Sequence, residues 1–204
     1  MAGGGPPQEA LLILGPTGSG KTPLGNHLAR NGWAGRCCFH FDFGARLRRA
    51  VGGKVGGFTD DEIAFLRQVL TSGALLENES FHLAERILQE FLDRCGIGTG
   101  DLLVLNGLPR HTGQATAIDA RVAVRTVIRL HCAPDVVLER LRRNAGGDRG
   151  SRTDDDAALV REKLRIYEGR TVQLAEHYRR RGAAMHDLRV SVATGPAELL
   201  ARLA

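Results

Sequence analysis

A glycine-rich segment, GPTGSGKT at residues 15–22, limits the folds open to this chain more than any other feature. It matches the pattern G-x-x-x-x-G-K-[ST] at every fixed position, with an apolar run at 10–14 before it and a helical pattern from Pro23 to Asn31-Gly32 after it. Glycines allow backbone N–H groups to close around phosphate oxygens, and a helix N-terminus adds partial positive charge. The segment therefore predicts a phosphate-binding loop formed by Gly15, Pro16, Thr17, Gly18, Ser19, Gly20, Lys21 and Thr22.

Two side chains of this loop carry the expected chemistry. The pattern places Lys21 where its ammonium group reaches the β- and γ-phosphates, which is a catalytic role. It places the hydroxyl of Thr22 where it ligates Mg²⁺. ATP and Mg²⁺ are therefore the expected ligands of the loop.

Length and composition exclude several classes of protein. The chain has 204 residues, 43% hydrophobic and 25% charged, as expected for one globular domain. It contains no run of about 18 apolar residues that would span a membrane. Residues 1–8 lack the charged and apolar regions of a signal peptide and predict a loose tail. The cysteines show no metal-binding spacing, so we expect reduced thiols and a cytoplasmic location.

The charge pattern favours small phosphorylated ligands. The formal net charge is +5, and because lysine occurs only at positions 21, 54 and 163, the other basic residues are all arginine. The planar guanidinium group of arginine can donate two parallel hydrogen bonds to a phosphate group. Aromatic residues make up only 5% of the chain, which disfavours a surface that stacks on nucleic-acid bases. We therefore expect nucleotides as partners, and neither nucleic acid nor membrane.

Apolar runs alternate with helical patterns along the chain, which predicts an α/β fold with a five-stranded parallel sheet flanked by helices. The expected strands are 10–14, 37–41, 101–106, 126–132 and 185–192. The expected helices are 23–31, 45–50, 59–71, 78–95, 134–143, 154–181 and 197–203. Val160, Leu164, Tyr167, Leu174 and Tyr178 follow a helical period and predict the core-facing side of the long helix 154–181.

Two glycine-flanked insertions interrupt this single domain of residues 1–204. The first covers about 52–80, begins with VGGKVGG at 51–57 and contains a capping-box pattern from Thr59 to Glu62. The second covers about 144–154. The glycine content of both insertions predicts mobility.

The guanine- and switch-reading motifs of GTPases are missing from the sequence, and further segments resemble the adenylate kinase family of nucleoside monophosphate kinases. Asn106-Gly107-Leu108-Pro109-Arg110, followed by Gln114, is similar to the family segment D-G-F-P-R…Q. The resemblance runs from the first strand to the last helix. It implies a P-loop kinase fold, a small helical acceptor-binding insertion at 52–80 and a short lid at 144–154. It also implies that Arg110 binds the acceptor phosphate, that Gln114 contacts adenine and that Gly107 is a further substrate-binding residue.

Other segments extend the resemblance. Residues 43–48 are similar to T-G-D-L-L-R, which implies that Arg48 binds the acceptor phosphate, and residues 73–76 are similar to G-x-L-V, which implies that Leu76 lines the acceptor nucleoside. Residues 151–155 are similar to G-R-x-D-D, so Arg152 is expected to clamp the transferring phosphates. Arg140 matches the family arginine that stacks on the ATP base.

These arginines suit phosphoryl transfer, which needs positioning and cations around a polyanionic transition state. Arg48, Arg110, Arg143 and Arg152 lie on separate elements that this architecture brings toward one point. We assign catalytic roles to Lys21, Arg110, Arg143 and Arg152.

Several positions depart from the family pattern. Asn106 replaces an aspartate that normally sits near Mg²⁺, and Ala45 replaces the aspartate of T-G-D. Asp42, at the end of the second strand, is a candidate for the missing carboxylate or for an acceptor contact. Lys163 stands where the family has an arginine, and Asn144 where it has the second lid arginine, with Arg143 one position away. We expect Asn106 near the metal and Lys163 near the acceptor.

The leading hypothesis is a monomeric nucleoside monophosphate kinase that transfers the ATP γ-phosphoryl group to AMP or a related nucleotide. A second hypothesis keeps ATP but makes Asp42 a base for the hydroxyl of a nucleoside or small metabolite. A third is a nucleotide-binding protein whose catalysis is weakened by Asn106. The paired acceptor arginines favour an anionic acceptor and therefore the first hypothesis.

Overall fold

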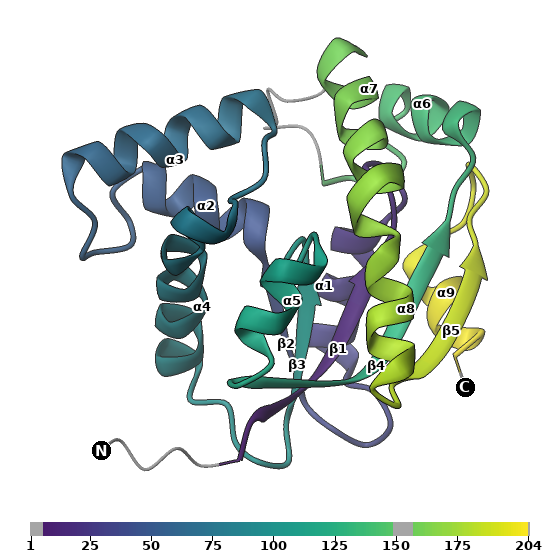
Figure 1. Ribbon diagram of the computed structural model, residues 1–204. Coiled ribbons are helices and arrows are strands. Elements are labelled where there is room, and N and C mark those ends of the chain that lie inside the picture. Colours follow the sequence, from purple (N-terminus) through teal and green to yellow (C-terminus); the bar gives the residue numbers. More distant parts are fainter. Residues whose placement is uncertain (1–5, 149–156, 204) are drawn as a thin grey trace.

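A computed structural model describes residues 6–148 and 157–203 of the chain. Its centre is a five-stranded sheet in which every pairing is parallel, with the strand order β2-β3-β1-β4-β5 (Figure 1). The strands are β1 (Gln8–Leu14), β2 (Cys38–Asp42), β3 (Leu102–Asn106), β4 (Val122–His131) and β5 (Ala184–Arg189). This confirms the predicted parallel α/β sheet.

Helices cover both faces of the sheet. Their bounds are α1 (Lys21–Asn31), α2 (Phe43–Val51), α3 (Asp60–Ser72), η1 (Asn78–Ser80), α4 (Phe81–Cys95), α5 (Thr112–Ile118), α6 (Pro134–Arg142), α7 (Ala157–Ile166), η2 (Tyr167–Thr171), α8 (Gln173–Arg180) and α9 (Pro196–Ala201). None of the helices in the described residues combines the length and hydropathy that a bilayer crossing requires.

The side chains of β1 divide the core into two layers. Ala10, Leu12 and Leu14 pack into one buried cluster with residues of α4, α5 and α8, whereas Leu11 and Ile13 pack into another with residues of α1 and α9. Successive side chains of a strand point to opposite faces. Because both faces of β1 are buried, its sequence is a continuous apolar run instead of an alternating one.

β4 begins earlier than predicted, at Val122 and not at Thr126. Val124 pairs with Ala10 and Thr126 with Leu11, so Arg125 is an extra residue without an opposite partner. Such a bulge interrupts the apolar alternation on which a prediction from sequence depends. The short helix α5 was also missed, because its seven residues include three of low helix propensity, Thr112, Gly113 and Thr116.

The predicted helix 154–181 is not one regular helix in its described part. Between α7 and α8 the π-helical turn η2 widens the coil, with Val172 N donating to Tyr167 O at 2.9 Å. The turn places the buried Thr171 so that its hydroxyl donates to Arg110 O at 2.8 Å. That contact comes from another part of the chain and leaves no periodic signal in the sequence.

The first insertion contains α3, which lies at the upper left of Figure 1, beyond α2. Its predicted capping box is confirmed, because Glu62 N donates to Thr59 Oγ1 at 3.2 Å and Thr59 N to Glu62 Oε2 at 2.8 Å. Most of the second insertion, including Arg152, lies outside the described residues.

Candidate active site

A pocket of about 200 Å³ opens at the carboxyl ends of the strands. Parallel α/β sheets bind ligands at this edge, because the loops that follow the strands meet there. The glycine-rich loop forms one wall, the start of α2 and the end of α3 form another, and α7 with η2 closes a third. The pocket therefore joins the predicted phosphate loop to the predicted acceptor insertion.

The phosphate loop leads directly into α1. Gly20 precedes the helix in a left-handed backbone conformation (φ 98°), which residues other than glycine rarely adopt. Lys21 Nζ lies 2.8 Å from Gly15 O and 2.6 Å from Pro16 O. Ser19 Oγ is fully buried and has no hydrogen-bond partner in the described part of the chain. A glycine-rich loop that leads into a helix N-terminus fits an anion-binding site.

A polar cluster lies below the first turn of α1. Thr22 Oγ1 donates to Asp42 Oδ2 at 2.6 Å, and Asn106 Nδ2 lies 3.1 Å from Thr22 Oγ1 and 3.2 Å from Asp42 Oδ2. The other oxygen of Asp42 accepts from Ala45 N at 2.9 Å and caps α2. Asp42 and Asn106 are directly paired across β2 and β3, so their proximity follows from the sheet register.

His40 contacts this cluster from a position on β2 two residues before Asp42. Its Nε2 lies 3.4 Å from Asn106 Nδ2, and its Nδ1 lies 2.9 Å from Asn26 Oδ1. Burial lowers the pKa of His40, which keeps the ring neutral at physiological pH. The ring packs against α1 where a Cβ on Gly25 would lie 2.3 Å from His40 Nε2, so the close approach depends on glycine.

The oxygens of Thr22 and Asp42 are hard ligands of the kind that Mg²⁺ prefers. No group of three or more His, Cys, Asp or Glu side chains within residues 6–148 and 157–203 is placed to hold a metal. One carboxylate and one hydroxyl nevertheless suit Mg²⁺, which commonly keeps several waters and completes its shell with substrate phosphates. The residues present therefore fit a Mg²⁺ that is held partly by a nucleotide.

Arg110 lines the opposite part of the pocket. Among residues 6–148 and 157–203, no side chain or carbonyl group pairs with its guanidinium group. Burial, and then the nearby positive charge of Arg170, lower the pKa of Arg110 to about 10, which leaves it charged at neutral pH. A half-buried cation without a counter-ion is a binding site for an anionic ligand.

Arg48, Gly107 and Lys163, which were predicted to bind the acceptor, also line the pocket. Arg140 lies at its edge and is 4% exposed. The Arg140 guanidinium donates to Gly18 O at 3.0 Å and approaches carbonyl oxygens of the β5–α9 connection at 2.7–3.1 Å. Those carbonyls belong to Ser191, Val192 and Thr194. In this conformation Arg140 connects the phosphate loop to the C-terminal part of the chain.

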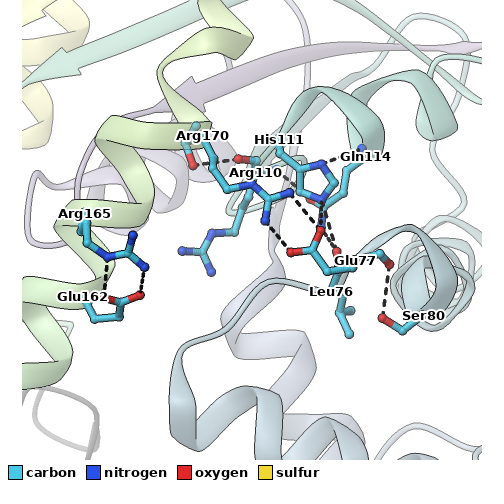
Figure 2. Close-up of polar contacts among 10 residues, drawn as sticks. Leu76, Glu77, Ser80, Arg110, His111, Gln114, Glu162, Arg165 and Arg170 are labelled. Atoms are coloured by element: carbon cyan, nitrogen blue, oxygen red, sulfur yellow. Dashed lines mark hydrogen bonds and ion pairs between the residues drawn. The ribbon is translucent and has the colours of Figure 1, made fainter.

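Pro16 and Ser19 of the phosphate loop are not among the residues that line the pocket, and neither are three residues predicted for the acceptor and lid regions. The side chain of Leu76 is 2% exposed and packs in the core. Gln114 is also 2% exposed, and its amide bonds Arg110 N and Leu76 O at 2.7 Å each (Figure 2). Arg143 is exposed at the C-terminal cap of α6 and pairs with Glu139. The sequence pattern alone did not indicate that backbone groups engage the Gln114 amide or that Glu139 pairs with Arg143.

Tyr167 and Thr171 are among the pocket residues that were not predicted as such. Tyr167, which the periodicity assigned to the core face, lines the pocket together with Thr171. Both lie at helical spacing from Lys163, four and eight residues further on, so the same helix face carries all three. That spacing from Lys163 was the sequence signal that could have identified Tyr167 and Thr171 as pocket residues, although the π-helical turn alters the spacing locally.

A phosphate loop at the carboxyl edge of a parallel sheet, facing arginine and lysine side chains across one pocket, defines the class of P-loop phosphotransferases. No protein-family profile matches the chain. It is 30% identical over 198 residues to the adenylate kinase of Synechococcus sp. (strain RCC307), covering 94% of this chain and 93% of that protein. It is 31% identical over 180 residues to the adenylate kinase of Prochlorococcus marinus (strain MIT 9303), covering 86% and 87%.

A shorter match reaches 39% identity over 84 residues with the adenylate kinase of Rhodopirellula baltica, covering 39% of this chain and 43% of that protein. The longer matches extend over most of both chains. The chain belongs to the adenylate kinase family, and it is an ATP-dependent phosphotransferase of the nucleoside monophosphate kinase type.

Proposed function

We propose that this protein transfers the γ-phosphoryl group of ATP to AMP, forming two molecules of ADP. The observation that carries the proposal is the guanidinium group of Arg110, which lines the phosphate-loop pocket without a counter-ion among the described residues. An acceptor that carries its own phosphate supplies the missing negative charge. The preference for AMP rests on the names of the relatives, because the Gln114 amide is engaged by Arg110 N and Leu76 O in this structure.

In this proposal the loop 15–22 binds the ATP phosphates and Lys21 contacts the β- and γ-phosphates. Arg48, Arg110 and Lys163 hold the acceptor phosphate in line with the γ-phosphorus, and its oxygen attacks there. Arg140 steadies the phosphate loop beside the ATP base. Arg143 and Arg152 approach the transferring group when the lid closes, which also excludes water.

We propose that Thr22 and Asp42 face Mg²⁺, with Asn106 beside them. Bound there, the ion would neutralise phosphate charge and orient the β- and γ-phosphates. Asp42 then supplies the carboxylate that the family has at the position of Asn106. Its contacts with Thr22, Asn106 and Ala45 N occupy both carboxylate oxygens, which favours this role over that of a base for a hydroxyl acceptor.

Replacement of Asn106 by aspartate tests this arrangement. The new carboxylate would lose the N–H contacts and lie against Asp42, so we expect the free energy of unfolding to fall by about 1–3 kcal/mol in EDTA. Saturating Mg²⁺ should restore part of this loss. Denaturant unfolding measures both values, and Asn31→Asp on the exposed end of α1 is the control. Equal stability of Asn106→Asp and the wild-type protein in EDTA would contradict the arrangement.

The function itself is tested by Mg²⁺-ATP turnover with AMP, CMP, UMP, GMP and a nucleoside, with products separated by chromatography. Formation of ADP from AMP, faster than reaction with the other acceptors, is the expected result. Preferential turnover of the nucleoside would support a hydroxyl acceptor instead. Tight ATP binding without any turnover would indicate a nucleotide-binding protein.

A further inference from the structure

The backbone of Arg110 is held on both sides by side chains. Arg110 N donates to Gln114 Oε1 at 2.7 Å, and Arg110 O accepts from Thr171 Oγ1 at 2.8 Å. Gln114 is 2% exposed and Thr171 is 7% exposed, so water competes little for either bond. The direction in which the Arg110 side chain leaves the chain is therefore determined by residues of α5 and η2.

The same two partners are connected to the acceptor insertion. Gln114 Nε2 donates to Leu76 O at 2.7 Å, and the buried His111 lies 3.3 Å from the same carbonyl oxygen. The next residue, Glu77, forms a two-point ion pair with Arg170, in which Arg170 Nη2 lies 2.9 Å from Glu77 Oε2. Arg170 immediately precedes Thr171 in η2.

These contacts close a ring through the connection between α3 and η1, the start of α5, and η2. Figure 2 labels Glu77, Gln114 and Arg170 of this ring. It shows the Arg110 side chain leaving the ring on the side away from Glu77, with no contact drawn to its guanidinium group. We propose that four residues position Arg110 for the acceptor phosphate, namely Glu77, Gln114, Arg170 and Thr171. This inference rests on the acceptor role proposed above for Arg110. The four residues act through Arg110; Thr171 lines the pocket, but its hydroxyl group donates to Arg110 O.

The charges of the ring support this role. Arg170 is close enough to Arg110 to lower its pKa, so two like charges are held side by side. Glu77 compensates Arg170, and the hydrogen bonds from Arg170 lower the pKa of Glu77. The ring thus keeps a second cation near Arg110 while leaving the Arg110 guanidinium available to a ligand.

The sizes of the expected effects differ along the ring. The Thr171 bond is buried, so Thr171→Val should raise the acceptor KM about tenfold, with kcat and the ATP KM within about twofold of wild type. The ion pair is about half exposed and screened, so Glu77→Ala should raise the acceptor KM by only about threefold, and less at high salt. Thr171→Ser retains the hydroxyl and should restore the wild-type KM.

Matched controls are available in the same region. Thr116→Val removes a hydroxyl-to-carbonyl bond within α5, and Glu162→Ala removes an ion pair with Arg165 on α7, also visible in Figure 2. Neither belongs to the ring, so both should leave the acceptor KM unchanged. An unchanged acceptor KM in Thr171→Val and Glu77→Ala would overturn the proposal. Equal changes in the acceptor and ATP KM values would also overturn it, because they indicate general loosening.

A readout without substrate separates this inference from the proposed function. If the wild-type protein phosphorylates no nucleotide, the proposed function fails, and the ring is judged by amide hydrogen exchange at Arg110. Because the Arg110 amide is bonded to Gln114, exchange about tenfold faster in Gln114→Met than in wild type, and severalfold faster in Glu77→Ala, supports the ring. Unchanged exchange in both variants overturns it.

Discussion

Lys21→Met is expected to lower kcat by about 10³-fold, because it removes a cation that is positioned for the charge that develops on the transferring phosphate. Lys21 Nζ lies against Gly15 O and Pro16 O, so the ammonium group is already held at the phosphate loop. Methionine has a similar length but no charge, which leaves the packing of the first turn of α1 largely intact. The ATP KM should also rise, since the lysine contacts bound nucleotide before transfer.

Steady-state kinetics with AMP and Mg²⁺-ATP measure this effect, and thermal unfolding shows whether the variant is folded. Arg30→Met, at the exposed C-terminal end of the same helix, is the matched control and should retain wild-type kinetics. If Lys21→Met keeps kcat within tenfold of wild type, the loop does not perform the phosphate chemistry assigned to it.

Arg110→Met should produce two effects of opposite sign. The kcat/KM for the acceptor should fall by about 10³-fold or more, because an arginine that stabilises transferring phosphate charge is typically worth about 10³–10⁵ in rate. The ATP KM should change little. The acceptor kcat/KM of Arg110→Lys should lie between those of the wild-type protein and Arg110→Met, since lysine keeps the charge but loses the two-point geometry of the guanidinium group.

The second effect of Arg110→Met is higher stability. The pKa of Arg110 is lowered in the folded protein, so the charged side chain has a higher free energy there than in the unfolded chain at neutral pH. Removing this charge should raise Tm, on the order of 2 °C for a chain of this length. Arg165→Met, which removes an exposed paired arginine, should change neither property. A lower Tm in Arg110→Met would show that the guanidinium group stabilises the fold.

The prediction from sequence succeeded where short segments carry the signal. β1 and the loop 15–22 are contiguous, and their glycines and apolar residues follow the local backbone geometry. The capping box of α3 is likewise local. The Arg125 bulge, the π-helical turn η2 and the short helix α5 were missed. The bulge interrupts the apolar alternation of β4, and α5 contains three residues of low helix propensity. The turn η2 includes a contact between Thr171 and the distant Arg110, which leaves no periodic signal.

Within the candidate site, the sequence by itself determined which residues supply charge and hydrogen-bonding groups, including the phosphate loop, Asp42, Arg48 and Arg110. Only the tertiary structure decided which of them are available. Gln114 and Arg143 are engaged by other groups, whereas the Arg110 guanidinium has no partner among the described residues and lines the pocket. The physical reason is that residue type and local spacing select an element, but the partners of a side chain come from segments that meet only when the sheet and its crossovers are complete.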